Sequence, residues 1–330
     1  MSAEGLDFLD EERPRIVMFC GKGGVGKTTS ASATALHFAR MGLRTLLISS
    51  DPTPSLSDIL EVDVRGKITP IEAASGLEAV ELDYDTVVEM WKEKFGEEVY
   101  EVISSFLPVD EEIIEYVANA PGIDQEFALS YIYDLHADGG YDVIVWDTAP
   151  AGGTLSLINL QDKFYRHLGD AARLYVRVRS ALEALTRGRA KRDPLQIIAE
   201  WEELAKSVLG MLRGEGTRAF LVTIPEALGV NQTQRVAIEL ERFGVNVSGV
   251  IVNYVVTEEI ATSEFNRLRR EMQLKYIEAL EELYGGAMRV VLMPLLPFEV
   301  KGVEALGEVE KRLFPGGPSS QQARAPEEML

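Results

Sequence analysis

The chain has 330 residues, of which 46% are hydrophobic and 26% are charged, as in a globular protein that can bury a large core. Its formal net charge of -20 repels polyanions over most of the surface and argues against nucleic acid as the main partner. One cysteine, Cys20, and three histidines exclude a disulfide framework and argue against a zinc or iron–sulfur site supplied by one chain.

The first 13 residues are acidic and lack the apolar core of a signal peptide, so we expect a flexible N-terminus. No apolar run approaches the roughly 20 residues that a membrane helix needs. We therefore expect a soluble protein of the cytoplasm.

Short runs rich in Val, Ile and Leu recur along the chain without the alternation of a half-exposed strand. The runs cover residues 15–20, 44–49, 142–146, 218–223, 247–253 and 289–293. Strands of this kind are buried on both faces, which predicts an α/β fold with a mainly parallel sheet flanked by helices. A helical pattern near 27–41, ended by Gly42, would complete one right-handed βαβ unit with the first two runs.

Between the first run and this helix lies the stretch CGKGGVGKTTS, Cys20 to Ser30. Its frame G-x-x-x-x-G-K-T is that of a phosphate loop, and a strand before it with a helix after it is the context that makes the pattern specific. Backbone N–H groups of such a loop surround phosphate oxygens at a helix N-terminus. The predicted nucleotide-binding residues are Gly21, Lys22, Gly23, Gly24, Val25, Gly26, Lys27, Thr28 and Thr29.

Within this loop, Lys27 is expected to neutralise the β and γ phosphates and the Thr28 hydroxyl to ligate Mg²⁺. Two aspartates follow buried strands at the sheet edge where α/β folds bind ligands. Asp147 can complete the metal site, directly or through water, or cap the segment after it. Asp51 can be an N-cap before Pro52 or orient the attacking water.

The base is predicted by exclusion. Proteins of this fold that read guanine carry an N-K-x-D run after a late strand, whereas the lysine and aspartate are missing after Asn253. The sequence therefore favours ATP, with Asn253 placed to touch the base.

Two segments interrupt the α/β rhythm. Trp91, Phe95, Val99, Val102 and Phe106 recur at steps of three and four, as in an amphipathic helix. A second series with the same spacing contains Phe164, Leu168, Ala171, Tyr175, Val178, Leu182 and Leu185, followed by Trp201, Leu204, Val208 and Leu212. Both predict helices that either pack on each other or line a groove.

The predicted organisation follows from these patterns. Residues 86–135 and 161–215 form one inserted helical subdomain that binds the substrate, and the α/β core comprises 14–85, 136–160 and 216–312. The Pro-, Gly- and Ser-rich residues 313–330 are expected to be a disordered tail, as residues 1–13 are at the other end.

Several motifs together resemble the arsenite-pump ATPase family over about residues 14–312. They are GKGGVGKTT, DPTPSLSD, DTAPAGGTL, PGIDQEFAL, TIPEALGV, REMQLKY and PLLPFEVKG. Within that family the resemblance is greatest to the archaeal and eukaryotic branch that targets tail-anchored membrane proteins. The phosphate loop alone is shared with the wider SIMIBI class of deviant P-loop NTPases.

The resemblance implies roles for individual residues. Lys22 would be the signature lysine that reaches across a homodimer to the partner's phosphates, comparable to an arginine finger. Asp51 would activate water in the first switch segment, and Asp147 would be the residue at which the second switch segment begins. The residues that frame adenine would be Asn253, Pro294 and Pro297.

Three departures from the family pattern stand out. Pro54 occupies a position in the first switch where the family has a histidine, and it stiffens that segment. Ser263 and Asn266 replace a Cys-x-x-Cys pair, so we expect no zinc bridging the dimer. Gln232 stands where the family often has a glutamate.

The resemblance implies a Mg²⁺-dependent ATPase that works as a homodimer. It would bind transmembrane segments of tail-anchored membrane proteins in its helical insertions and release them for insertion, with the help of a membrane receptor. Hydrolysis would then drive a two-state switch.

Two other functions stay open. The ATPase subunit of an arsenite or oxyanion pump would want soft thiolates, which this chain lacks. A partition or positioning ATPase acting on DNA or membrane would use the basic stretch between Lys163 and Arg192. A metabolic enzyme that shares the loop is a further alternative, although no other catalytic constellation is visible.

Overall fold

The computed structural model describes residues 5–51, 55–105, 107, 109–120, 123–149 and 192–317, without the side chains of 124–126. The chain divides into two compact units. Unit 1 comprises Met1–Glu81, Asp138–Leu155 and Arg213–Leu330, and unit 2 comprises Leu82–Ala137 and Ser156–Leu212. The predicted boundaries at 86 and 215 therefore differ from the observed ones by a few residues.

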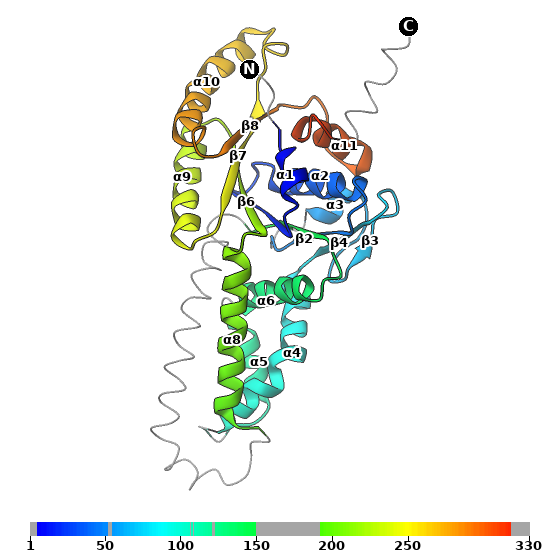
Figure 1. The fold of residues 1–330 in the computed structure, drawn as a ribbon, viewed down its shortest axis with the longest axis vertical. Coiled ribbons are helices and arrows are strands. Elements are labelled where there is room, and N and C mark those ends of the chain that lie inside the picture. The colour runs from blue at the N-terminus through cyan, green and yellow to red at the C-terminus, as the bar shows by residue number, and fades with distance from the viewer. Residues whose placement is uncertain are drawn as a thin grey trace. The chain divides into compact units, whose positions relative to one another are not determined.

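Unit 1 is built on one sheet with the strand order β3-β4-β2-β5-β1-β6-β7-β8 (Figure 1). The strands are β1 (Ile16–Gly21), β2 (Thr45–Ser49), β3 (Thr69–Pro70), β4 (Leu77–Glu81), β5 (Val143–Asp147), β6 (Thr217–Thr223), β7 (Val247–Val255) and β8 (Arg289–Pro294). All neighbouring pairs are parallel except β3 with β4. The parallel α/β prediction is confirmed, and the six predicted runs are all strands.

Helices cover both faces of this sheet. The helices of unit 1 are α1 (Phe8–Glu12), α2 (Lys27–Arg40), α3 (Leu56–Leu60), α9 (Ala227–Arg242), α10 (Glu264–Tyr284) and α11 (Gly302–Leu313). Helices α2 and α11 pack together on one face, over a core that includes Phe19, Leu47 and Val145. Helices α9 and α10 lie on the opposite face, against β6, β7 and β8 (Figure 1). Both faces of the central strands are therefore buried, which explains their continuous apolar runs.

The predicted N-terminal and C-terminal tails are wrong where the structure describes them. Leu6 and Leu9 are fully buried, and Leu6 N donates a hydrogen bond to the Leu313 carbonyl oxygen at 2.6 Å. Phe314 is also buried and stacks on His37, with 3.7 Å between the ring centroids. The two ends of the chain bury each other, so residues 5–13 and 313–317 belong to the fold.

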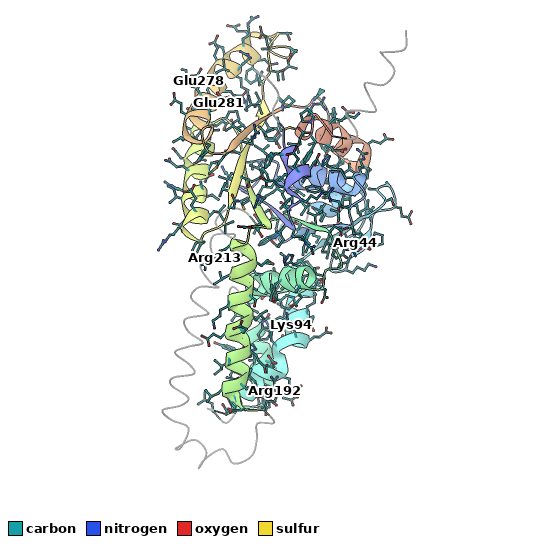
Figure 2. The ribbon with its side chains drawn as sticks, viewed as in Figure 1. Arg44, Lys94, Arg192, Arg213, Glu278 and Glu281 are labelled. Atoms are coloured by element: carbon teal, nitrogen blue, oxygen red, sulfur yellow. The ribbon has the colours of Figure 1, made fainter. Side chains whose placement is uncertain are left out.

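Unit 2 is helical in its described part, with α4 (Tyr84–Ser104), α5 (Glu112–Ala118), α6 (Ile123–Ala137) and α8 (Pro194–Arg213), whose last residue belongs to unit 1. Helix α4 begins after Asp83, whose carboxylate accepts the N–H of Thr86 at 3.0 Å. Arg192, labelled in Figure 2, bonds Glu98 of α4 at 2.8 Å. In the part of the chain that the structure describes, no helix combines the length and apolar character needed to cross a membrane.

Some predicted features lie outside the described residues. These are Phe106, the series from Phe164 to Leu185, the basic stretch up to Lys191, the segment Pro52 to Pro54, and residues 318–330.

Candidate nucleotide site

The carboxyl ends of β1, β2 and β5 meet because these strands are parallel and in register. Phe19 of β1 pairs with Asp147 of β5, which pairs with Ser49 of β2. The phosphate loop follows β1 and Asp51 follows β2, so both reach the edge where Asp147 ends β5. Residues predicted from three separate segments therefore lie at one ligand-binding edge of the sheet.

Close packing fixes the path of the phosphate loop. Gly26, the residue before α2, has φ 99°, and a Cβ there would lie 2.2 Å from Nδ2 of Asn253. A Cβ on Gly21 would lie 2.2 Å from the Val222 carbonyl oxygen. Because Gly26 has no side chain to cap α2, the first N–H groups of that helix are left to bind an anion.

Lys27 and Asp51 form an ion pair at the base of the loop. Lys27 Nζ lies 3.5 Å from Asp51 Oδ2, and the two residues are only 4% and 9% exposed. A buried ammonium needs a compensating anion, and this carboxylate supplies it. The pairing places the candidate base beside the lysine expected to hold the β and γ phosphates.

Thr28 and Asp147 are directly bonded. The Thr28 hydroxyl donates to Asp147 Oδ2 at 2.7 Å, and the Ser49 hydroxyl donates to the same oxygen at 3.1 Å. Burial raises the pKa of the Asp147 carboxyl to about 6, against the lowering effect of the Thr28 hydrogen bond and the Lys27 charge. The other oxygen, Oδ1, is buried and has no hydrogen-bond partner among the described residues.

These donors fit a magnesium ion. Mg²⁺ prefers oxygen ligands and is commonly held by one or two protein groups together with nucleotide phosphates. The unpartnered Oδ1 of Asp147 and the Thr28 hydroxyl are hard oxygen donors, and a cation beside them would relieve the buried carboxylate. Among the described residues no three Asp, Glu, His or Cys side chains gather as a metal site, so this ion would depend on the nucleotide for further ligands.

Lys22 differs from Lys27 in its surroundings. Its side chain is exposed, at the start of the loop, whereas that of Lys27 is buried. Lys22 also lines a hollow of about 10 Å³ together with Gln232 of α9, whose buried amide oxygen has no partner in the described part of the chain. Such a hollow is the size of one water molecule.

The predicted adenine residues lie on the adjoining strands β7 and β8 and in the loop after β8. Asn253 Nδ2 donates to the Val25 carbonyl oxygen at 2.9 Å, so this side chain braces the phosphate loop. Pro294 ends β8 and pairs with Val255 of β7, while Pro297 is exposed in the loop that follows. The structure brings Asn253 to the loop and leaves the two prolines near the end of the neighbouring strand.

A family model described as anion-transporting ATPase matches residues 14–315. This chain belongs to the anion-transporting ATPase family. It therefore hydrolyses ATP.

Individual relatives carry two kinds of name. The chain is 29% identical over 310 residues to "ATPase ASNA1 homolog 1" of Paramecium tetraurelia, covering 90% of this chain and 92% of that protein. It is also 29% identical over 307 residues to "ATPase GET3" of Phaeosphaeria nodorum, covering 90% and 94%. An Aquifex aeolicus relative named "Putative arsenical pump-driving ATPase 1" is 29% identical over 324 residues, covering 92% and 80%.

In this member of the anion-transporting ATPase family, Ser263 and Asn266 shape the start of α10. The Ser263 hydroxyl accepts the N–H of Asn266 at 3.1 Å, and the Asn266 amide donates to the Ile260 carbonyl oxygen at 2.8 Å. Ser263 is therefore the N-cap residue of α10, and neither side chain supplies a thiolate.

Sequence reasoning missed four polar residues around the site. Ser49 bonds Asp147, and Ser55 Oγ lies 3.3 Å from Thr28 Oγ1. Buried Gln273 of α10 accepts the N–H of Val256 at 2.8 Å and donates to the Tyr254 carbonyl oxygen at 3.0 Å, which holds the turn after β7. The fourth, Glu81, ends β4 and is 1% exposed. No signal in the sequence pointed to it, because no strand was expected over Leu77–Glu81.

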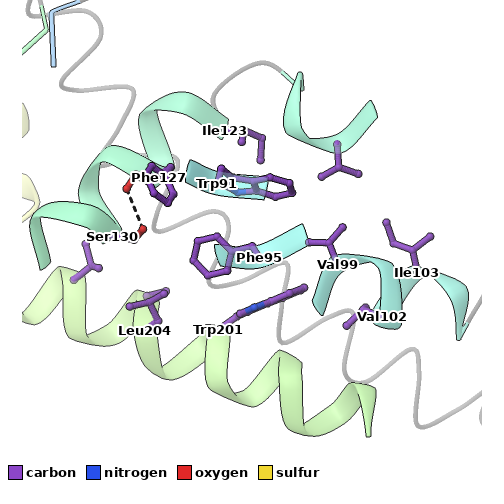
Figure 3. Close-up of a pocket in the computed structure, with 13 residues that line it drawn as sticks. Trp91, Phe95, Val99, Val102, Ile103, Ile123, Phe127, Ser130, Trp201 and Leu204 are labelled. Carbon is purple, nitrogen blue, oxygen red and sulfur yellow. Dashed lines mark hydrogen bonds between the residues drawn. The ribbon is translucent and has the colours of Figure 1, made fainter. Parts of the chain in front are cut away.

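Unit 2 contains a second hollow, of about 230 Å³ (Figure 3). Its walls are apolar and come from α4, α5, α6 and α8. They include Trp91, Phe95, Val99 and Val102 of the first predicted series and Trp201, Leu204 and Val208 of the second. Among the described residues of the lining, Ser130 is the one without an apolar body, and its hydroxyl donates to the Phe127 carbonyl oxygen at 2.9 Å. The members of the two series named here therefore face one apolar space.

Proposed function

We propose that this chain is a Mg²⁺-dependent, homodimeric ATPase of the cytoplasm that binds transmembrane segments of tail-anchored membrane proteins and releases them for insertion. The observation that carries the proposal is the apolar hollow in a helical unit of an ATPase. An enzyme acting only on a nucleotide needs no such space, whereas a carrier of apolar segments does.

The residues of the site have distinct tasks in this proposal. Lys27 binds the β and γ phosphates, and Asp51, once released from Lys27, orients the attacking water. Thr28 and Asp147 hold the magnesium ion, which neutralises charge on the phosphates when bound. Lys22, exposed at the loop entrance, serves the partner subunit's nucleotide. Asn253, Pro294 and Pro297 border the adenine.

The names of the relatives also include an arsenical pump-driving ATPase, but the chemistry of this chain favours the carrier. Cys20 is fully buried in β1, and burial raises its pKa to about 12, so its thiol stays neutral. A metalloid site built on thiolates therefore has no donor here.

The test is capture of a synthetic transmembrane segment by the purified protein in ATP and Mg²⁺. Ala205→Phe, which fills part of the hollow, should reduce capture and leave ATP hydrolysis unchanged. Lys206→Phe, which adds the same ring at the neighbouring exposed position of α8, is the matched control and should leave capture intact. Absence of capture by the unmodified protein with every nucleotide would refute the proposal.

A further inference from the structure

The start of α3 is capped by a side chain from another strand. Ser55 is the N-cap residue of α3, yet its own hydroxyl makes no capping hydrogen bond. Instead, Glu81 Oε1 accepts the N–H of Ser55 at 2.7 Å and that of Leu56 at 2.8 Å. Because the carboxylate does the capping, the Ser55 hydroxyl can face Thr28, with 3.3 Å between the two oxygens.

Glu81 itself is held rigidly. Its second oxygen, Oε2, accepts the Ser57 hydroxyl at 2.8 Å. Its backbone N–H donates to the Val64 carbonyl oxygen at 2.8 Å, and its carbonyl oxygen accepts the Gly66 N–H at 2.9 Å. Since the residue is 1% exposed, three donors from the start of α3 compensate the burial of its carboxylate.

The sheet places this carboxylate beside the metal edge. Glu81 of β4 pairs with Ser49 of β2, and Ser49 pairs with Asp147 of β5. Side chains of one register row lie on the same face of a sheet. The helix α3 anchored by Glu81 follows the segment that begins at Asp51, so this anchor holds the far end of the predicted first switch.

Glu81 is also the last residue of the first segment of unit 1. The next residue, Leu82, is the first of unit 2, and α4 starts at Tyr84. We propose that Glu81 is a positioning residue that couples the nucleotide site to unit 2: it holds Ser55 beside Thr28, and it transmits movement of α3 to the chain entering α4. The inference rests on the proposed magnesium site. It does not require that the protein binds a transmembrane segment.

Three variants test it. Glu81→Met keeps the length of the side chain and removes both acceptor oxygens. Glu81→Gln keeps one acceptor for the two N–H groups and can donate to the Ser57 hydroxyl, so it should restore function. Glu78→Gln is the control on the same strand, where Glu78 is half-buried and accepts the Tyr141 hydroxyl.

Two readouts are taken with ATP and Mg²⁺ alone. The first is hydrolysis, in which Glu81→Met should lower kcat about tenfold and raise the Mg²⁺ concentration for half-maximal rate, with ATP affinity nearly unchanged. The second is the fluorescence of Trp91 and Trp201 of unit 2 in a Trp146→Phe background, where ATP should change the signal of the parent and of Glu81→Gln but not of Glu81→Met.

Any result that differs from these expectations overturns the inference. If Glu81→Met hydrolyses ATP with the parent's kcat and Mg²⁺ dependence, the carboxylate does not position the site. If ATP leaves the unit 2 signal of the parent unchanged, or changes it equally in Glu81→Met, the coupling is refuted. Should Glu81→Met fail to fold, Ser57→Ala removes one of the three donors and should give a smaller effect in the same direction; no effect would count against the proposal. If the protein fails to capture a transmembrane segment, both readouts can still be taken. The two proposals can therefore fail independently.

Discussion

Asp147 makes stability depend on pH in a direction opposite to that of most carboxylates. The residue is fully buried and its pKa is raised from 3.8 to about 6. An acid whose pKa is higher in the folded state binds protons more tightly when folded, so stability falls as pH rises from 3.8 through 6. A difference of this size corresponds to about 3 kcal/mol at pH 7.5 in the absence of nucleotide and metal.

The substitution Asp147→Asn removes this titration and keeps most of the contacts. The amide oxygen can still accept the Thr28 and Ser49 hydroxyls, while the new NH₂ group takes the place of unpartnered Oδ1. That NH₂ lacks an acceptor and costs about 1–3 kcal/mol, independent of pH. The advantage of the Asn variant over the parent should therefore grow by about 1 kcal/mol between pH 5.0 and pH 7.5.

Urea unfolding followed by the fluorescence of Trp146, next to Asp147 in β5, measures this difference in a Trp91→Phe, Trp201→Phe background. The pH range of the experiment starts at 5.0 so that it stays above the isoelectric point of about 4.7, where the protein has no net charge. Asp142→Asn is the control: Arg44, bonded to Asp142 at 2.9 Å, lowers the pKa of that carboxyl to about 2, so its effect should be flat over this range. A flat difference for Asp147→Asn as well would refute the reasoning. With Mg²⁺ and nucleotide present, the parent should gain more stability than the Asn variant.

Three further predictions follow from the geometry. Lys22→Ala should keep ATP affinity and lose most of kcat, whereas Lys27→Ala should weaken binding itself; titration with a fluorescent ATP analogue and steady-state hydrolysis separate the two, and equal loss of affinity would contradict a role for Lys22 in the partner's site. Asn253→Ala should weaken ATP binding about tenfold because the loop loses its brace at Val25, while Asn246→Ala at the other end of β7 should not; the same titration decides it. His37→Ala should lower the free energy of unfolding by about 3 kcal/mol, since it removes a buried ring that bonds Asp10 at 2.8 Å. Urea titration measures this free energy, and a value equal to that of the parent would contradict the prediction.

The parts of the fold that could be predicted are those where local sequence and position agree. The strand β1, the loop and α2 follow each other within 25 residues of sequence, from Ile16 to Arg40, so an apolar run, a motif and a helical period confirm one another. Asp147 was identified because β5 is a continuous apolar run that ends in an acid. In each case the signal lies within one short window.

The ends of the chain could not be predicted in this way. The acidic start of the sequence has the composition of a solvated tail, but Leu9 and Phe8 find apolar partners that lie elsewhere in the sequence. Likewise His37 is buried between Asp10 of α1 and Glu310 of α11, and Arg40 pairs with the same Glu310. A local pattern carries no information about partners hundreds of residues away.

The polar residues missed at the site share one physical cause. Strand β4 reads LEAVE, which mixes acids with apolar residues and resembles an exposed segment, so no strand was expected there. Once β4 pairs with β2, the register aligns Glu81 and Ser49 with Asp147, and their side chains come to the face that carries α2 and α3. A slip of one residue in the pairing of β4 with β2 would turn the Glu81 side chain to the other face of the sheet. The phosphate loop can be identified as a motif, but the carboxylate and hydroxyls that hold its metal edge and its first switch are selected by register, which only the paired strands define.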